Sequence, residues 1–404
     1  MLPSRTRGSY ALLGLVACSS GFEPPCRVTD RRVVLDEPPA TLAGIGLVGL
    51  SSRPLRPLLR SDGSSVFRWW RIQVDSDSIP SAATTTISAE VAVLDPQGVL
   101  ETRHSFVPAH TIGQSFGIRD FAWMNDGVGL VYTRTTTTPV STENMTSLMF
   151  AFEPTQTLGT LPDAQCLNCS FEWSTASFDD HFVTVYARRA LTRSTDATDF
   201  PLRFATLSRT GDVLASGTLG PIETAPLGGA ASFELVADRD VLLLKTKLLA
   251  QRITSTFEVQ MGPIHYSSKG LPAVSWDSDR AALAWTSKIL SSALATNADL
   301  FIQTYSFEGN PLSDENRLST ASTIEGMRPF LGGHAVAFTD GAGTYLALTS
   351  ADGSKVGGDL PLDDSTDAPL TARPGLLETR SESTLELVQF TDRGLEAVEV
   401  ACDR

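Results

Sequence analysis

Short apolar runs recur along most of this chain, and polar turns separate them every few residues. The runs are rich in Val, Leu, Phe, Tyr and Trp, whereas Asp, Gly, Asn and Ser fill the breaks between them. Few stretches place apolar residues at the i, i+3, i+4 and i+7 spacing of an amphipathic helix. The pattern therefore predicts an all-β protein that is built from many short strands.

Several of these runs resemble one another. The segment FAWMNDGVGLVYTR at 121–134 aligns with VSWDSDRAALAWTS at 274–287, so that Trp123 matches Trp276 and one polar turn matches the other. Each copy predicts a strand, a tight turn and a second strand. Further copies occupy 177–189 and 330–340, and a looser copy occupies 234–247.

A second repeated element follows each hairpin, and it consists of an apolar strand, a glycine turn and another short strand. Gly98 and Gly394 mark its first and last copies, and the 296 residues between them fit six intervals of about 49 residues. Seven units of four antiparallel strands form a β-propeller. Six or eight blades, or tandem β-sandwiches, are the alternatives, because strand spacing alone does not exclude them. The other turn glycines are Gly211, Gly309 and Gly353, with a weaker copy at Gly262.

The propeller domain is expected to occupy 41–404. A ring of blades must be closed, and a strand within RVTDRRVVLDE at 27–37 could join the last blade. The segment 18–40 would then hold a tether and this ring-closing strand. The individual units are expected at 41–106, 107–162, 168–220, 228–268, 271–318, 325–363 and 366–402.

The first residues predict an export signal. Arg5 and Arg7 precede the apolar stretch Tyr10 to Ala17, which is too short to span a bilayer as a helix. The stretch ends in Leu-Val-Ala-Cys18, which resembles the lipobox of bacterial lipoproteins. That resemblance implies cleavage of residues 1–17, a diacylglycerol on the Cys18 thiol and acylation, as by palmitate, of the new amino terminus. An ordinary cleavable signal, or a misplaced start codon, is the alternative.

Five cysteines occur in the chain, and setting Cys18 aside for lipid leaves four. Disulfides are the default in an exported protein, and four cysteines allow three pairings. We favour Cys166–Cys169 as a local bridge and Cys26–Cys402 as a clasp between the chain ends. A redox pair or half a zinc site is the alternative for Cys166 and Cys169, but neither the helix context nor further ligands are visible.

Composition and charge limit the kinds of partner that we expect for this chain. The chain has 404 residues and a net charge of −14, from 32 basic and 46 acidic side chains. Basic residues gather only at Arg31-Arg32 and over 53–60, so nucleic acid is not expected as a partner. The apolar stretch at 41–50 is short and contains three glycines, so we expect no membrane helix beyond the signal.

Two well-known motifs are matched by residue pattern alone. Residues 113–117 read G-x-S-x-G, but a nucleophile elbow at Ser115 needs a strand before it and a helix after it. Residues 44–49 read G-x-G-x-x-G, but dinucleotide binding needs the same flanking elements. Neither context is present in the sequence. We therefore assign no catalytic residue and no cofactor.

Metal and sugar sites also lack support. The histidines at 104, 110, 181, 265 and 334 are scattered. The acidic clusters at 75–77 and 277–279 are better explained as hairpin turns than as calcium loops, which need more oxygen ligands. The tryptophans at 69, 70, 123, 173, 276 and 285 could line a sugar site, but their repeat-aligned spacing favours a place in the core.

The repeat AVSWDSDRAALAW at 273–285, followed by ADLFIQTYSFEGNPL at 298–312, resembles the propeller-like repeat lipoproteins of some Gram-negative bacteria. That resemblance implies a shape and leaves the activity open. We expect a monomeric, non-enzymatic binding module on the cell envelope, at the outer membrane, with a protein or glycan partner. The alternatives are an envelope assembly scaffold and an exported hydrolase that acts on glycans or peptides in the channel. The hydrolase would need acids or histidines that converge with perturbed pKa values.

Overall fold

The protein is all-β over the residues that its structure, a computed structural model, describes. All the regular secondary structure in this part of the chain consists of β-strands, as the sequence pattern predicts. The described ranges are 26–36, 49–74, 85–107, 120–124, 127–137, 144–153, 157–167, 169–178, 180–190, 201–221, 233–239, 241–246, 249–254, 259–265, 272–277, 280–287, 298–340, 342–362, 375–391 and 393–403.

Four sheets are antiparallel meanders, in which each strand pairs with the next one along the chain. The first contains β7 (Phe121–Met124), β8 (Gly127–Thr137), β9 (Asn144–Glu153) and β10 (Thr157–Leu167). The second contains β11 (Cys169–Ser177), β12 (His181–Ala190), β13 (Pro201–Ser208) and β14 (Val213–Pro221). The third contains β19 (Ala273–Trp276), β20 (Arg280–Thr286), β21 (Ala298–Ser306) and β22 (Asn316–Ala321). The fourth contains β23 (Thr323–Phe330), β24 (Gly333–Thr339), β25 (Thr344–Thr349) and β26 (Lys355–Pro361).

A nine-stranded sheet joins two further groups of strands. The groups meet through one parallel residue pair, Leu59 with Asp238, beside which the Arg239 amide donates to the Leu59 carbonyl at 2.8 Å. The seven-blade count stays a prediction, because two expected units share this sheet. One group is β15 (Phe233–Asp238), β16 (Val241–Thr246), β17 (Leu249–Thr254) and β18 (Val259–His265). The other is β2 (Gly49–Pro54), β3 (Leu58–Leu59), β4 (Ser65–Val74), β5 (Thr85–Leu94) and β6 (Leu100–Phe106).

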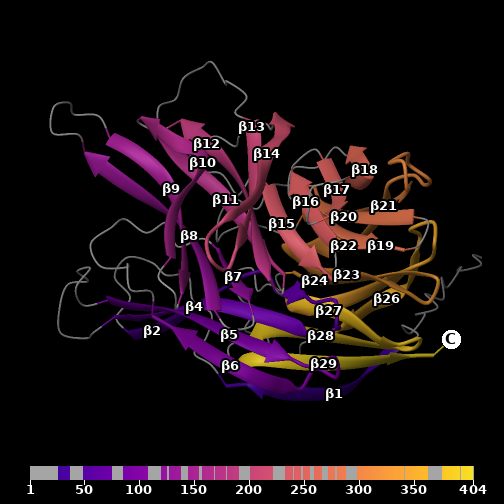
Figure 1. Ribbon diagram of the computed structural model, residues 1–404. Coiled ribbons are helices and arrows are strands. Elements are labelled where there is room, and N and C mark those ends of the chain that lie inside the picture. Colours follow the sequence, from indigo (N-terminus) through magenta and orange to yellow (C-terminus); the bar gives the residue numbers. More distant parts are fainter. Residues whose placement is uncertain are drawn as a thin grey trace, which may run out of the picture.

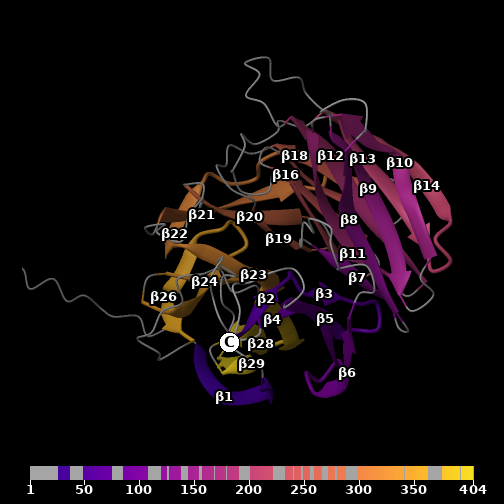
Figure 2. The same ribbon diagram turned by 90° about the vertical axis from the view of Figure 1, so that its left-hand side faces the viewer.

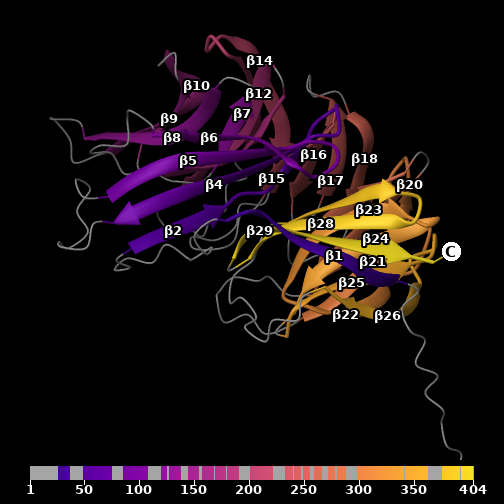
Figure 3. The same cartoon turned by 90° about the horizontal axis from the view of Figure 1, so that it is seen from below.

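The last sheet combines the two ends of the described chain, and we call it the closing sheet. Its order is β1-β29-β28-β27, so that the first described strand pairs antiparallel with the last one (Figures 1 and 3). The strand expected within 27–37 therefore lies at the edge of the final sheet. The closing sheet contains β1 (Cys26–Leu35), β27 (Gly375–Ser381), β28 (Thr384–Thr391) and β29 (Gly394–Cys402).

The sheets follow one another around the molecule, as Figure 2 shows. Their first strands pack together in chain order: β7 contacts β11, β11 contacts β15, β19 contacts β23, and β23 contacts β27. Sheets of four antiparallel strands that pack through their inner strands in this way form a β-propeller. The predicted fold class is confirmed.

The hydrophobic core lies between neighbouring sheets. Phe390 of β28 packs edge-on against Phe67 and Trp69 of β4, with ring centroids 6.3 and 5.5 Å apart. These rings belong to a buried cluster that also includes residues of β5 and β29. One continuous core therefore joins the sheet that contains β4 to the closing sheet. The glycines at 98, 211, 309, 353 and 394 have φ between 77° and 118°, which explains why the repeat keeps glycine at its turns.

Candidate functional site

Eight charged side chains converge from the inner parts of several sheets, and we call them the central cluster. Seven have side chains no more than 18% exposed, and Arg56 is 41% exposed. The convergence of acids with shifted pKa values is the feature that a hydrolase would need. Its members are Arg56, Arg68, Asp120, Glu234, Asp238, Lys245, Arg328 and Glu378.

Glu234 is held by two cations. Strand β15 alternates buried and half-buried positions, which places Glu234 on its more polar face. Lys245 Nζ lies 2.5 Å from one carboxylate oxygen, and Arg56 Nε lies 3.1 Å from the other. Burial alone would raise the pKa of Glu234, but Lys245 and Arg56 outweigh it and lower that pKa to about 2. Glu234 is therefore an ionised partner and not a proton donor at neutral pH.

Arg68 and Asp120 form the most deeply buried pair. The Arg68 side chain is 1% exposed, and its Nη1 lies 3.0 Å from Asp120 Oδ1. Asp120 also accepts backbone hydrogen bonds from Phe121 at 2.9 Å and from Thr175 at 2.8 Å. Burial raises the pKa of Asp120 and lowers the pKa of Arg68, and their mutual attraction opposes both shifts. The net effect is to move the pKa of Asp120 upward, toward neutrality.

Arg328 ties three inner strands together. It extends from β23 to Asp238 of β15, with Nη1 at 3.0 Å from Oδ2, and to Glu378 of β27, with Nη2 at 2.6 Å from Oε1. Burial alone would lower the pKa of Arg328, but the two carboxylates raise it. Every acid of the central cluster therefore contacts a basic side chain. Paired charges of this kind fix the relative positions of strands rather than supply free acids.

The histidines do not gather at one site. His334 of β24 lies against Ser275 of β19, with Nδ1 3.2 Å from Oγ. The two residues are 2% and 0% exposed, and burial lowers the pKa of His334 to about 4. A nucleophilic serine must be reached by substrate, so this buried pair is structural. The His104 ring packs at a tilt of 34° against Trp123, with ring centroids 4.5 Å apart, and His181 Nδ1 forms a hydrogen bond with the Asp180 carboxylate.

Other residues that the sequence singled out are placed as follows. Five of the six tryptophans are 5% exposed or less, which confirms that they are core residues; Trp276 packs against a neighbouring cluster. Cys18, His110, Ser115 with its motif, and Gly44 to Val48 lie outside the described residues. Among the residues described, no group of His, Cys, Asp and Glu could hold a metal ion. No helix in that same part is long and apolar enough to cross a membrane.

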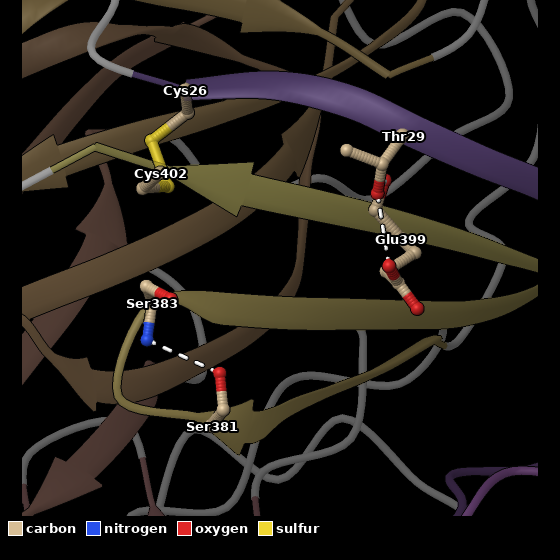
Figure 4. Close-up of a disulfide and its surroundings, with 6 residues drawn as sticks. All are labelled: Cys26, Thr29, Ser381, Ser383, Glu399 and Cys402. Carbon is tan, nitrogen blue, oxygen red and sulfur yellow. Dashed lines mark hydrogen bonds between the residues drawn. A yellow bond between two sulfur atoms is a disulfide. The ribbon is translucent and has the colours of Figure 1, made fainter.

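Two disulfides are present in the described chain. Cys166 and Cys169 connect the end of β10 to the start of β11, a strand-to-strand connection rather than a helix start. Cys26 and Cys402 join β1 to β29 (Figure 4). Beside this bond, Thr29 Oγ1 donates to Glu399 Oε1 at 2.9 Å, and the Cys402 amide donates to the Ser383 carbonyl at 2.8 Å. The disulfide therefore lies at a corner of the closing sheet where hydrogen bonds also connect the neighbouring strands and turn.

A cavity of about 730 Å³ opens beside this clasp, and we call it the rim pocket. Its floor includes Phe330 and Leu348, which share a buried cluster with Cys26 and Cys402. Sequence reasoning missed this pocket, because its residues come from separate hairpin turns. The available signal in the sequence was Leu331, an apolar residue at a hairpin turn whose counterparts in the other repeats are polar. The lining residues are Phe330, Leu331, Gly332, Leu348, Thr349, Ser350, Val356, Glu382 and Asp403.

No protein-family model matches this chain, and no curated protein sequence matches it. Several solved structures are similar. The acylaminoacyl peptidase of Pyrococcus horikoshii is 9% identical at a TM-score of 0.36, over 84% of this chain and 49% of the peptidase. This chain thus spans about half the length of that peptidase.

Two similar structures are separate domains. The WD40 domain of Pan2 from Neurospora crassa is 8% identical at a TM-score of 0.34, over 87% of this chain and 89% of that domain. The β-propeller domain of the trilobed protease from Pyrococcus furiosus is 8% identical at a TM-score of 0.35, over 87% and 93%. At these identities and TM-scores, the likenesses carry no argument about what this chain does.

Proposed function

We propose that this chain is an exported lipoprotein of the bacterial envelope whose propeller serves as a binding module. The binding role rests on one observation, the contrast between the central cluster and the rim pocket. Each acid of the central cluster contacts a cation, whereas the rim pocket is open and mainly apolar. Paired charges suit a rigid scaffold, and a concave apolar surface with a few polar groups suits a ligand. Loops and turns on such a scaffold can vary in sequence without disturbing its core.

The anchor is the second part of the proposal. Cys18 stands eight residues before Cys26, so an extended tether would keep β1 within about 28 Å of a lipid on Cys18. A disulfide at Cys26–Cys402 fits an exported protein, because oxidising compartments preserve such bonds. Several acyl chains would hold the protein stably at the membrane, whereas one holds it only marginally.

The test is fractionation and capture in a Gram-negative host. We expect the full chain to sediment with membranes and to be released when Cys18→Ser is introduced; Cys26→Ser is the matched control and should stay membrane-bound. A pull-down from solubilised membranes should then recover a protein or glycan. Sedimentation of the Cys18→Ser protein with membranes would contradict the anchor, and capture of nothing would contradict the binding role.

A hydrolase that acts on glycans or peptides is the alternative, and the raised pKa of Asp120 is the observation in its favour. An acid in a low-polarity environment can donate a proton at neutral pH. The alternative requires product from glycan or peptide substrates and its loss in Asp120→Asn. We expect no product from either protein, because Asp120 is engaged by Arg68 and two backbone amides.

A further inference from the structure

We propose that the rim pocket holds one of the acyl chains attached to Cys18 of the same polypeptide. This inference rests on the lipid anchor in the proposed function, and it names an occupant that regulates access to the pocket. It follows from three features: apolar walls whose polar neighbours are engaged by the protein, a strained leucine at the edge, and the nearness of the start of β1.

The walls of the rim pocket are apolar and partly open. Leu331 and Val356 are 39% and 41% exposed, while Phe330 and Leu348 are buried. A volume of about 730 Å³ lies within the range of sites that enclose a small organic molecule. Covering the exposed parts of Leu331 and Val356 would remove apolar surface from water, which favours an apolar occupant.

Three of the four polar side chains that line the pocket have partners within the protein. Ser350 Oγ donates to Asp352, and Thr349 Oγ1 accepts from the His334 amide at 3.2 Å. Glu382 also interacts with another group of the protein. The pocket therefore offers a ligand mainly apolar surface. A hydrocarbon chain suits such a surface, because it has no hydrogen-bonding group to satisfy.

Leu331 occupies a backbone position that disfavours its side chain. Its φ is +51° and that of Gly332 is +77°, so the two residues at the tip of the β23–β24 hairpin are left-handed. Asn followed by Gly is the usual pair at such a turn, and leucine costs backbone energy there. Leu331 also belongs to none of the hydrophobic clusters among the described residues. Strain at a residue that does not pack into the core points to contact with a ligand, and a leucine selects an apolar one.

The first described strand begins beside the pocket. Cys26, at the start of β1, belongs to the same buried cluster as the lining residue Leu348. Its disulfide partner Cys402 precedes Asp403, an exposed lining residue (Figure 4 shows the disulfide). Cys18 stands eight residues before Cys26, a distance of at most about 28 Å when extended. A lipid on Cys18 is therefore within reach of the pocket, and its tether keeps it there at a high effective concentration.

The number of acyl chains allows one of them to leave the bilayer. The lipobox resemblance implies two chains on the diacylglycerol of Cys18 and one on the new amino terminus. One chain in the pocket leaves two in the membrane, and two chains are enough for stable anchoring. A partner that uses the same pocket would have to displace this chain, so the chain controls when the site is open.

The first test detects the chain in the lipidated full-length protein. Cells that express the protein are given palmitate with a photoreactive diazirine at its methyl end, and their membranes are irradiated before the protein is digested. We expect an adduct that joins the Cys18 lipopeptide to a peptide containing Leu331 or Val356. Adducts of the Cys18 lipopeptide with bilayer lipids only, or a phospholipid adduct in the pocket, overturn the inference and leave the anchor intact. A Cys18 peptide that carries no lipid removes the anchor, and the inference falls with it.

The second test removes the covalent chain and measures what the vacant pocket prefers. Calorimetry titrates the full-length Cys18→Ser protein, in buffer without detergent, with 1-pentanol, 1-hexanol, 1-heptanol and 1-octanol. Each added methylene that enters the pocket should tighten binding about fourfold. No binding of octanol, or an affinity that does not rise with chain length, overturns the proposal.

Two matched variants locate the site while the fold is kept. Leu331→Asn supplies the residue that this left-handed turn prefers, so it should keep or raise the melting temperature. It should also weaken octanol binding at least about fivefold and abolish the photoadduct at the hairpin tip. Leu214→Asn, at an exposed leucine of β14, is the control and should change neither. Unchanged octanol affinity in Leu331→Asn would place the probe elsewhere and overturn the proposal.

Discussion

Cys26 and Cys402 lie directly opposite each other across the β1–β29 pair, although 376 positions separate them in the sequence. The disulfide between them therefore closes nearly the whole described chain into one loop. In the chain-entropy account, a bond that closes a longer loop restricts the unfolded state more strongly.

We accordingly expect Cys26→Ala with Cys402→Ala to lower the free energy of unfolding by about 3 to 5 kcal/mol. Cys166→Ala with Cys169→Ala is the matched control, because its loop has a separation of only 3 and should cost much less. Denaturant unfolding of the three proteins measures the difference. Equal midpoints for the first variant and the unaltered protein would contradict a native Cys26–Cys402 bond.

The junction between the closing sheet and the β5–β6 turn predicts an unequal effect of two identical substitutions. A Cβ on Gly98 would lie 2.5 Å from Glu386 Oε2, where Arg32 and Arg380 both pair with that carboxylate. Gly332 has the same φ of +77° but open space around it. Gly332→Ala should cost about 1 kcal/mol for backbone strain alone, and Gly98→Ala about 1 to 3 kcal/mol more. Equal losses in thermal unfolding would mean that the ion-paired junction is not tight.

His334 predicts a loss of stability in mild acid. Burial lowers its pKa from the ordinary 6.5 to about 4, so between these values only the unfolded chain takes up the proton. Its contribution is complete above pH 6.5 and is lost as the pH falls toward 4, by about 3 kcal/mol. His334→Gln should flatten the curve of stability against pH over this interval. A curve of unchanged slope in His334→Gln would contradict the assignment.

Glu234 governs a lower interval of pH. Its pKa of about 2 in the folded protein lies below the ordinary 4.5, so its contribution is present above pH 4.5 and disappears as the pH falls toward 2. At neutral pH, Glu234→Gln leaves Lys245 buried without its anionic partner and should cost about 3 to 5 kcal/mol. Glu101→Gln, on an exposed position of β6, should cost little. Similar unfolding midpoints for both variants would show that the pair contributes no stability.

The repeating features of this fold could be predicted from sequence, because they depend on neighbours along the chain. Alternation of apolar and polar residues specified the strands, and Gly98 or Gly394 marked turns that require positive φ. The segment 234–247, the loosest of the repeats, became the β15–β16 hairpin. Local pattern therefore sufficed for the strands and turns.

The central cluster and the rim pocket could not be predicted in the same way. Arg56 and Glu234 are 178 residues apart, and a single charge in a strand reads equally well as a solvent-facing position. The pairing of Leu59 with Asp238 depends on a short strand that has no pattern of its own. The rim pocket is assembled from turns of three hairpins, whose proximity depends on how two sheets pack.

The position of β1 also determines when the molecule can be finished. Its pairing partner β29 is the last of the described strands, so β1 must wait until the strands between them have been synthesised. An interrupted chain would expose the unpaired edge of β1, and exposed edges promote association with other chains. Closure of the sheet thus reports that synthesis has passed β29, and chaperones or proteases can distinguish the open and closed states by that edge.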